Sequence, residues 1–198
     1  EVIGDRSFSD DPATVTAYGG AFAAGLEDEG IMPVYKHFPG HGHGSGDSHT
    51  GSVQTPPLDQ MQDSDLVPFR NLINSGAGVM VGHLDVPGLT TPDVPASISP
   101  QAIGLLRTGV GYGAAPFNGP IFTDDLSGMA AITDRLGVPQ AVEAAIVAGL
   151  VKAPSSYSPT ADAEAARDRA LERDARRRAS VLPLSPPPVP ERPAVAPA

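Results

Sequence analysis

Residues 31–49 read IMPVYKHFPGHGHGSGDSH, and this stretch decides how the rest of the chain can be arranged. Residues 31–35 form a short apolar run that predicts a buried β-strand. Residues 36–49 follow as a loop with four of the five histidines of the protein, one lysine, one aspartate and four glycines. A buried strand that opens into such a loop predicts a site for proton transfer at the strand's end.

Two later apolar runs end in ionisable residues in the same way. Residues 79–81 (VMV) predict a second buried strand that closes at Gly82 and His83. Residues 119–123 (GPIFT) predict a third strand that ends at Asp124 and Asp125. If the strands are parallel, their carboxyl ends meet at one edge of the sheet, where the active sites of α/β folds lie.

Four helices are predicted between and after these strands. Asp11-Pro12 and Ser99-Pro100 each combine a helix-capping residue with a proline in the first turn of a helix. The other two helices are expected at residues 66–75 and 139–148. Strands that alternate with helices predict an α/β fold with a parallel sheet and helices on its outside.

Composition and charge exclude some classes of partner. Residues 1–150 contain 5 Lys and Arg against 17 Asp and Glu, a net charge of −12, whereas residues 151–198 contain 8 against 6. An acidic main body disfavours nucleic acid, because phosphate binding needs clustered Lys and Arg. The chain has no cysteine, hence no disulfide or thiolate metal site. No apolar run approaches the roughly 20 residues of a membrane helix, so no membrane segment is expected.

The histidine loop admits three interpretations. His37, His41, His43 and His49 could bind a metal, but the glycines between them provide no rigid face, and no H-E-x-x-H pattern occurs. The glycines could simply bend the chain, with the histidines incidental. We favour acid/base chemistry by Asp47 and His49, because a carboxylate two residues away can orient an imidazole and raise its basicity.

Asp124 and Asp125 are the candidate nucleophiles. Side chains alternate along a strand, so we expect one of the two carboxylates to point into the site. A capping role for both carboxylates is the alternative. A nucleophilic carboxylate with an acid/base group suits glycoside hydrolysis, although the same residues suit other hydrolyses. The chain contains neither a G-x-S-x-G elbow nor a P-loop lysine pattern.

Three segments carry a family pattern: IGDRSFSDDP at residues 3–12, KHFPGHGHGSGDSH at 36–49 and GPIFTDDLSGM at 119–129. In order and spacing, over about residues 1–149, they resemble the β-N-acetylglucosaminidases of glycoside hydrolase family 3. The resemblance implies a (β/α)8 TIM barrel and a retaining mechanism with a covalent glycosyl-enzyme intermediate. It also implies an exo-acting enzyme without a cofactor. Its carbohydrate substrates would be N-acetylglucosaminides such as peptidoglycan-derived muropeptides.

The resemblance also implies roles for single residues. Asp124, the first of the pair, matches the nucleophile, and His49, assisted by Asp47, matches the general acid/base on a mobile loop. The loop glycines would let His49 swing in and out of the site. The positions that bind sugar hydroxyls are matched by Arg6, Lys36 and His37.

Three histidines have lesser expected roles. His83 matches a Pro-Ala-His region in relatives, and we expect it to line the site. His41 and His43, in the middle of the loop, are expected to serve the shape of the loop and not its chemistry. No metal ligand is assigned to any of them.

The barrel implied by the resemblance is incomplete. A (β/α)8 barrel needs about 250 residues, and only three strands are clear here. We therefore expect residues 1–149 to be the C-terminal portion of the catalytic domain, in a truncated chain. Residues 150–198 form an Arg- and Pro-rich tail, expected to be helical at first and then disordered. The abrupt change of composition is typical of a frameshifted or miscalled end.

Two other functions stay open. A β-glucosidase-like family 3 enzyme is one, although such enzymes generally lack the Asp-x-His loop. The other is an inactive remnant or sugar-binding fragment, because half a barrel exposes sheet edges and apolar faces. The sequence leaves open a cytoplasmic, exported or lipid-anchored location.

Overall fold

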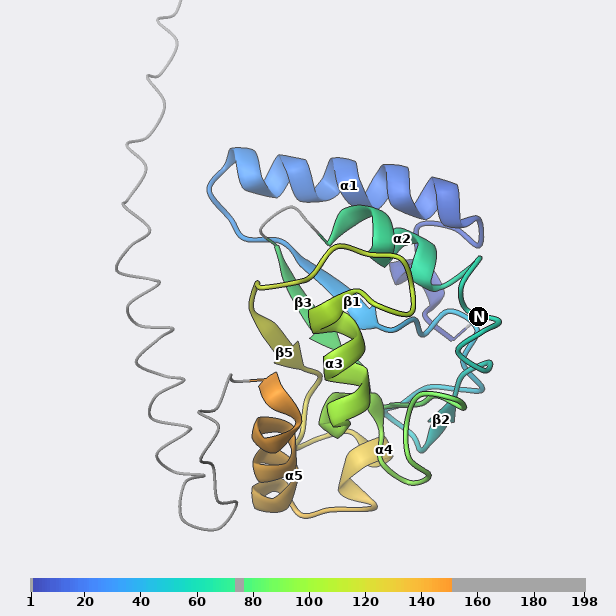
Figure 1. Ribbon diagram of the computed structural model, residues 1–198, viewed down its shortest axis with the longest axis vertical. Helices are drawn as coiled ribbons and strands as arrows, with labels where there is room; N and C mark the ends of the chain where they lie inside the picture. The colour runs from blue at the N-terminus through green and yellow to red at the C-terminus, as the bar shows by residue number, and fades with distance from the viewer. Residues whose placement is uncertain (1, 74–76, 151–198) are drawn as a thin grey trace, which may run out of the picture.

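The computed structural model describes residues 2–73 and 77–150 of the chain (Figure 1). Its centre is a parallel three-stranded sheet in the order β1-β3-β5, formed by Val34–Phe38, Gly78–Val81 and Ile121–Thr123. All three predicted strands are present and parallel, so the α/β prediction is confirmed. The predicted tail, residues 150–198, lies outside the described residues apart from Leu150.

The first strand begins later than predicted. It spans Val34–Phe38 instead of residues 31–35. Pro33 has no N–H to donate to a sheet, but its carbonyl accepts a hydrogen bond of 2.9 Å from the first residue of β3, which starts the pairing of the two strands. Lys36 and His37, expected in the loop, therefore belong to β1.

The helices surround the sheet, with α1 packed on α2 above one end of it and α3 in front of the strands (Figure 1). Both predicted caps are confirmed: Asp11 accepts hydrogen bonds from backbone N–H groups of the first turn of α1, and Ser99 does the same for α3. The last predicted helix is present, and a π-helical turn, Ile146–Leu150, continues it. The α-helices are α1 (Pro12–Asp28), α2 (Leu66–Leu72), α3 (Pro100–Thr108), α4 (Ala130–Thr133) and α5 (Val138–Ala145).

A second, smaller sheet lies beyond the carboxyl ends of the main strands. It consists of β2 (Val53–Gln54) and β4 (Leu84–Asp85), which pair in parallel. β2 follows the histidine loop, and β4 follows β3 after two residues. Single 3-10 turns at Gly4–Arg6 and Ala96–Ile98 complete the described elements. This small sheet was not predicted from the sequence, and it fixes the end of the histidine loop.

The core consists of two apolar clusters. The larger one lies between the main sheet and helices α2 and α3, and the smaller one lies under α4 and α5. Members of the larger cluster include Phe38, Leu66, Phe69, Val79, Val81, Ile103, Leu106 and Tyr112. The smaller cluster contains Ile98, Met129, Ile132, Ala141 and Ala145. Residues of β3 and β5 belong to the larger cluster, which therefore fixes these two strands in the core.

Helix α1 is present as predicted, but most of its apolar residues are not buried. Tyr18 and Phe22 are both 63% exposed. Phe8 stacks on Tyr18 and packs against Phe22 with tilted rings, at ring-centroid distances of 6.4 and 6.3 Å. Ala23 is the buried residue of the helix. The helix therefore presents an aromatic face to solvent.

Candidate active site

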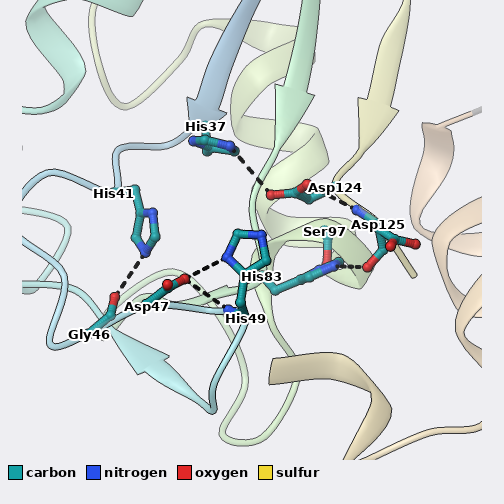
Figure 2. Close-up of polar contacts among 9 residues, drawn as sticks. All are labelled: His37, His41, Gly46, Asp47, His49, His83, Ser97, Asp124 and Asp125. Atoms are coloured by element: carbon teal, nitrogen blue, oxygen red, sulfur yellow. Dashed lines mark hydrogen bonds and ion pairs between the residues drawn. The ribbon is translucent and has the colours of Figure 1, made fainter. Parts of the chain in front are cut away.

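The three strands of the main sheet deliver ionisable side chains to one edge. β1 carries His37 near its end, β3 is followed by His83, and β5 is followed by Asp124. Figure 2 shows the arrowheads of the strands pointing toward this group, with Asp47 and His49 on the side away from the sheet. The topology therefore brings together residues that the sequence places far apart.

His37 and Asp124 contact each other past the end of the central strand. Nε2 of His37 lies 3.4 Å from Oδ2 of Asp124, and the two side chains are 10% and 18% exposed. The register of β1 against β3 shifts between Lys36 and Phe38, and such irregularities re-aim side chains. Burial lowers the pKa of His37 to about 4, against the opposing effect of the Asp124 charge. The imidazole is therefore neutral near pH 7.

The two aspartates of the predicted pair have different partners. Asp124 faces His37, and its backbone N–H donates to the carbonyl of Val81 at 3.0 Å. Asp125 accepts hydrogen bonds at Oδ1 from the hydroxyl and the N–H of Ser127, at 2.6 and 2.8 Å, which lower the pKa of its carboxyl. One carboxylate points into the site, as predicted, and the other stabilises the following turn.

Asp47 and His49 form a hydrogen-bonded pair on the loop. Nδ1 of His49 lies 2.6 Å from Oδ1 of Asp47, and the same oxygen accepts the backbone N–H of His49 at 3.0 Å. These hydrogen bonds from His49 lower the pKa of Asp47, so its carboxylate stays ionised. The side chains are 57% and 50% exposed. The predicted contact between Asp47 and His49 is present. It leaves Nε2, the other ring nitrogen of the exposed His49 side chain, without a bond to Asp47.

The other two loop histidines hold the backbone of the loop in place. Nε2 of His41 lies 3.2 Å from the carbonyl of Gly46, and its ring is buried against that of His37. Nδ1 of His43 lies 2.7 Å from Oδ2 of Asp65, a carboxylate that is 4% exposed. Burial lowers the pKa of His41. Both contacts agree with the expected role of these histidines in the shape of the loop.

Gly40 is required at the start of the loop. Its φ is +142°, a backbone conformation that favours glycine, and a Cβ there would collide with the Cβ of Asp65. The loop therefore leaves β1 by passing directly over the carboxylate that holds His43.

Arg6, Lys36 and His37 line the same open groove, which has a volume of about 780 Å3 and runs between α1 and β1. Its other walls come from residues 2–10, from α1 and α2, and from the start of the histidine loop, and many of these residues are apolar. Asp47, His49 and Asp124 do not line it, and His37 joins the groove to Asp124. The structure thus groups the predicted sugar-binding residues on one side of the predicted nucleophile.

His83 has a more specific environment than the sequence indicated. Its ring is 1% exposed, with Nε2 2.8 Å from the carbonyl of Asp125 and Nδ1 2.7 Å from the hydroxyl of Ser97 (Figure 2). A carbonyl can only accept, so Nε2 carries the proton and Nδ1 accepts from Ser97. Burial lowers the pKa of His83, which keeps this arrangement neutral. His83 therefore holds the peptide group that follows Asp125, and it does not line the groove.

Arg135 is a residue near the site that the sequence did not single out. Its guanidinium donates to Asp85 and to Ser52, and so connects the end of the histidine loop with β4 and the segment after α4. Arg135 belongs to no recognisable motif. A single arginine in a polar segment is common on protein surfaces, so nothing in the sequence indicates its contacts.

Within residues 2–73 and 77–150, no three His, Cys, Asp or Glu side chains are grouped so that they could hold a metal ion. In the same part of the chain, no helix has both the length and the apolar character needed to cross a membrane.

The fold and the site together define an α/β protein with imidazole–carboxylate pairs at the carboxyl edge of a parallel sheet. Residues 1–159 match the family model of the N-terminal domain of glycosyl hydrolase family 3. The chain therefore belongs to glycosyl hydrolase family 3, as the three sequence segments indicated.

Relatives with names and structures agree with this assignment. The chain is 66% identical over 149 residues to the β-hexosaminidase LpqI of Mycobacterium tuberculosis, a match that covers 75% of this chain and 38% of the relative. The structure of M. tuberculosis LpqI matches with a TM-score of 0.74 at 59% identity, over 92% of this chain and 52% of that one.

Two further structures are similar. One is a family 3 β-N-acetylglucosaminidase from Paenibacillus sp., with a TM-score of 0.72 at 28% identity over 96% of this chain and 40% of that one. The other is NagZ from Neisseria gonorrhoeae in complex with N-trifluoroacetyl-D-glucosamine, with a TM-score of 0.61 at 34% identity over 74% and 40%. The chain spans about half or less of the length of these relatives.

Proposed function

We propose that this chain is the catalytic part of a retaining exo-β-N-acetylglucosaminidase that hydrolyses terminal β-N-acetylglucosaminides. Family membership and the β-hexosaminidase relatives support the reaction class. The observation that carries the proposal is a pair of imidazole–carboxylate contacts at one sheet edge, Asp124 with His37 and Asp47 with His49. Residues 1–149 would form the C-terminal portion of a (β/α)8 barrel, followed by the tail.

Asp124 is the proposed nucleophile. Its carboxylate attacks the anomeric carbon, the bond to the aglycone oxygen breaks, and a glycosyl-aspartate ester forms. Its Oδ1 accepts the backbone N–H of Asp125 at 3.0 Å, and its Oδ2 faces the neutral ring of His37. A neutral partner orients the carboxylate without cancelling the negative charge that the attack requires.

His49 is the proposed general acid/base. It protonates the departing oxygen in the first step and takes a proton from the attacking water in the second step. Asp47 occupies Nδ1, so Nε2 is the nitrogen available to the substrate. The carboxylate also stabilises the imidazolium that must exist before protonation of the leaving group.

The sugar is proposed to lie against Arg6, Lys36 and His37. These side chains line one groove, which His37 connects to Asp124, and their N–H groups can donate hydrogen bonds to hydroxyl oxygens. The substrates would be N-acetylglucosaminides derived from peptidoglycan, including muropeptides. Neither a cofactor nor nucleic acid has a part in this proposal.

A second candidate is a sugar-binding chain without turnover. The exposed Tyr18 and Phe22 on α1 favour it, because apolar surface of this kind is usually covered in a complete domain. A β-glucosidase-like activity is disfavoured by the Asp47–His49 pair, which carboxylate-based acid/base catalysis does not need.

Hydrolysis of chromogenic N-acetylglucosaminides by the 198-residue chain tests the proposal. Asp124→Asn should abolish turnover, because the amide cannot form the ester intermediate. The matched control is Asp125→Asn, whose side-chain oxygen can still accept from Ser127 and which should keep most of the activity.

The role of His49 is tested with a series of leaving groups. His49→Gln should slow the release of poor leaving groups strongly and of dinitrophenol little, because a good leaving group needs no protonation. His43→Gln is the control from the same loop and should not change this dependence. Equal losses across the series would remove His49 from the acid role. Wild-type chain that binds N-acetylglucosamine but hydrolyses nothing would favour the second candidate.

A further inference from the structure

The side chain of Arg135 connects three segments at the carboxyl edge of the sheet. The guanidinium of Arg135 donates to Oδ1 and Oδ2 of Asp85 at 2.9 and 2.6 Å, from two different nitrogens. One of these nitrogens also donates to the hydroxyl of Ser52 at 2.7 Å. Ser52 immediately precedes β2, Asp85 ends β4, and Arg135 follows α4. A single side chain thus connects the end of the histidine loop to two other segments.

Helix α4 binds the backbone of the proposed acid/base dyad, the Asp47–His49 pair. The N–H of Ala131 donates to the carbonyl of Ser48 at 3.1 Å, and that of Ala130 donates to the carbonyl of His49 at 3.4 Å. The helix is anchored by Ile132, which is fully buried in the smaller apolar cluster. The backbone of His49 and that of the residue before it, Ser48, are therefore attached to a packed element.

The same packed element follows Asp124 directly. Five residues, 125–129, separate Asp124 from α4, and Met129 at their end is 2% exposed. His83 fixes the carbonyl of Asp125 from the other side. The predicted nucleophile and the backbone donors to the dyad therefore belong to one short, well-anchored stretch that ends at Arg135.

The geometry of the contact between Arg135 and Asp85 restricts the movement of both side chains. The side chains are 17% and 25% exposed, and the two parallel hydrogen bonds fix the angle as well as the distance. The hydrogen bonds to Asp85 raise the pKa of Arg135, so the guanidinium keeps its charge. A lysine would carry the same charge but could not make the two parallel hydrogen bonds.

We propose that Arg135 is a positioning residue for the acid/base dyad: through Ser52 and Asp85 it fixes residues 48–55, and so sets the position of His49 relative to Asp124. This inference rests on the proposed function, because the distance from His49 to Asp124 matters only if both act on one glycosidic bond.

Hydrogen–deuterium exchange of the 198-residue chain tests the positioning without requiring activity. Arg135→Met should raise exchange in peptides from residues 48–55 by about tenfold, the factor expected for a lost charge-assisted hydrogen bond. Arg135→Lys and Ser52→Ala should give smaller increases. The control is Arg107→Met, which removes a half-buried guanidinium that binds the carbonyls of Phe117 and Gly119 and should leave residues 48–55 unchanged.

Hydrolysis provides the second measurement. Arg135→Met should lower kcat for poor leaving groups far more than for good ones, with KM little changed, and Arg135→Lys should restore part of the loss. A chain without turnover would overturn the proposed function and leave the exchange result to decide the positioning. Exchange at residues 48–55 that is equal in Arg135→Met and Arg107→Met would overturn the inference. An equal loss of kcat across all leaving groups would do the same.

Discussion

Acidification from pH 7 to pH 5 should destabilise the fold, with His37 responsible for a large part of the effect. Burial lowers the pKa of His37 from 6.5 to about 4. The folded state therefore keeps the ring neutral at pH values where the unfolded chain takes up a proton. The pKa of His37 is lower in the folded state than in the unfolded state. The contribution of its neutral ring to the free energy of unfolding is therefore complete above about pH 6.5 and is lost as the pH falls toward 4.

The size of the effect follows from these two values. At pH 5 the unfolded chain gains on the order of 2 kcal/mol from protonation of His37, and almost nothing at pH 7. Burial also lowers the pKa values of His41 and His83, so their contributions have the same sign. The wild-type chain should therefore lose at least about 2 kcal/mol of unfolding free energy over this range.

Urea unfolding followed by circular dichroism at pH 7, 6 and 5 measures the effect. His37→Gln should reduce the loss between pH 7 and 5 by about 2 kcal/mol, whatever its effect at pH 7. His49→Gln is the control, because it replaces a histidine whose side chain is 57% exposed instead of buried. Equal pH dependence in wild type and His37→Gln would refute the reasoning, because it would mean that the ring is protonated in the folded state.

Four substitutions test the packing, each by thermal and urea unfolding. Gly104→Ala, in the interior of α3 with open space at its Cβ, should stabilise the chain by about 0.5–1 kcal/mol. Gly109→Ala should destabilise it by about 2 kcal/mol or more, because φ is +70° and the Cβ would meet the backbone that follows. Tyr112→Phe should be neutral or stabilising, since the buried hydroxyl has no partner among the described residues. Phe38→Ala should cost about 3–5 kcal/mol, and a loss below 1 kcal/mol would contradict its place in the core.

The sequence was sufficient to predict the main sheet and the edge of it at which ionisable residues gather. Short apolar runs bounded by glycine and proline predict buried parallel strands, and an ionisable residue at the end of each run predicts the site edge. Asp11 and Ser99 start helices because a side-chain oxygen before a proline satisfies free N–H groups, a local effect that needs no tertiary structure.

The remaining features depend on contacts between distant segments. The strands β2 and β4 have two residues each, too few to show periodicity. Arg135 lies 83 positions from Ser52 and 50 from Asp85, and no pattern links them. The exposure of Tyr18 and Phe22 depends on what covers α1, which helical spacing does not reveal. The bounds of β1 depend on its pairing with β3, and this pairing moved His37 from the loop into the strand.

Geometry alone offers two imidazole–carboxylate pairs on the histidine loop, and their surroundings separate them. His43 and Asp65 are as close as Asp47 and His49, at 2.7 and 2.6 Å, and both imidazoles are more than half exposed. The carboxylate of Asp65 is 4% exposed and lies under Gly40, so this pair serves to attach the loop to the body of the protein. The backbone of His49 is instead bonded to α4, which five residues separate from Asp124. Among residues 2–73 and 77–150, only the second pair is bonded to the segment that carries the proposed nucleophile. A shared anchor is what two groups acting on one bond require.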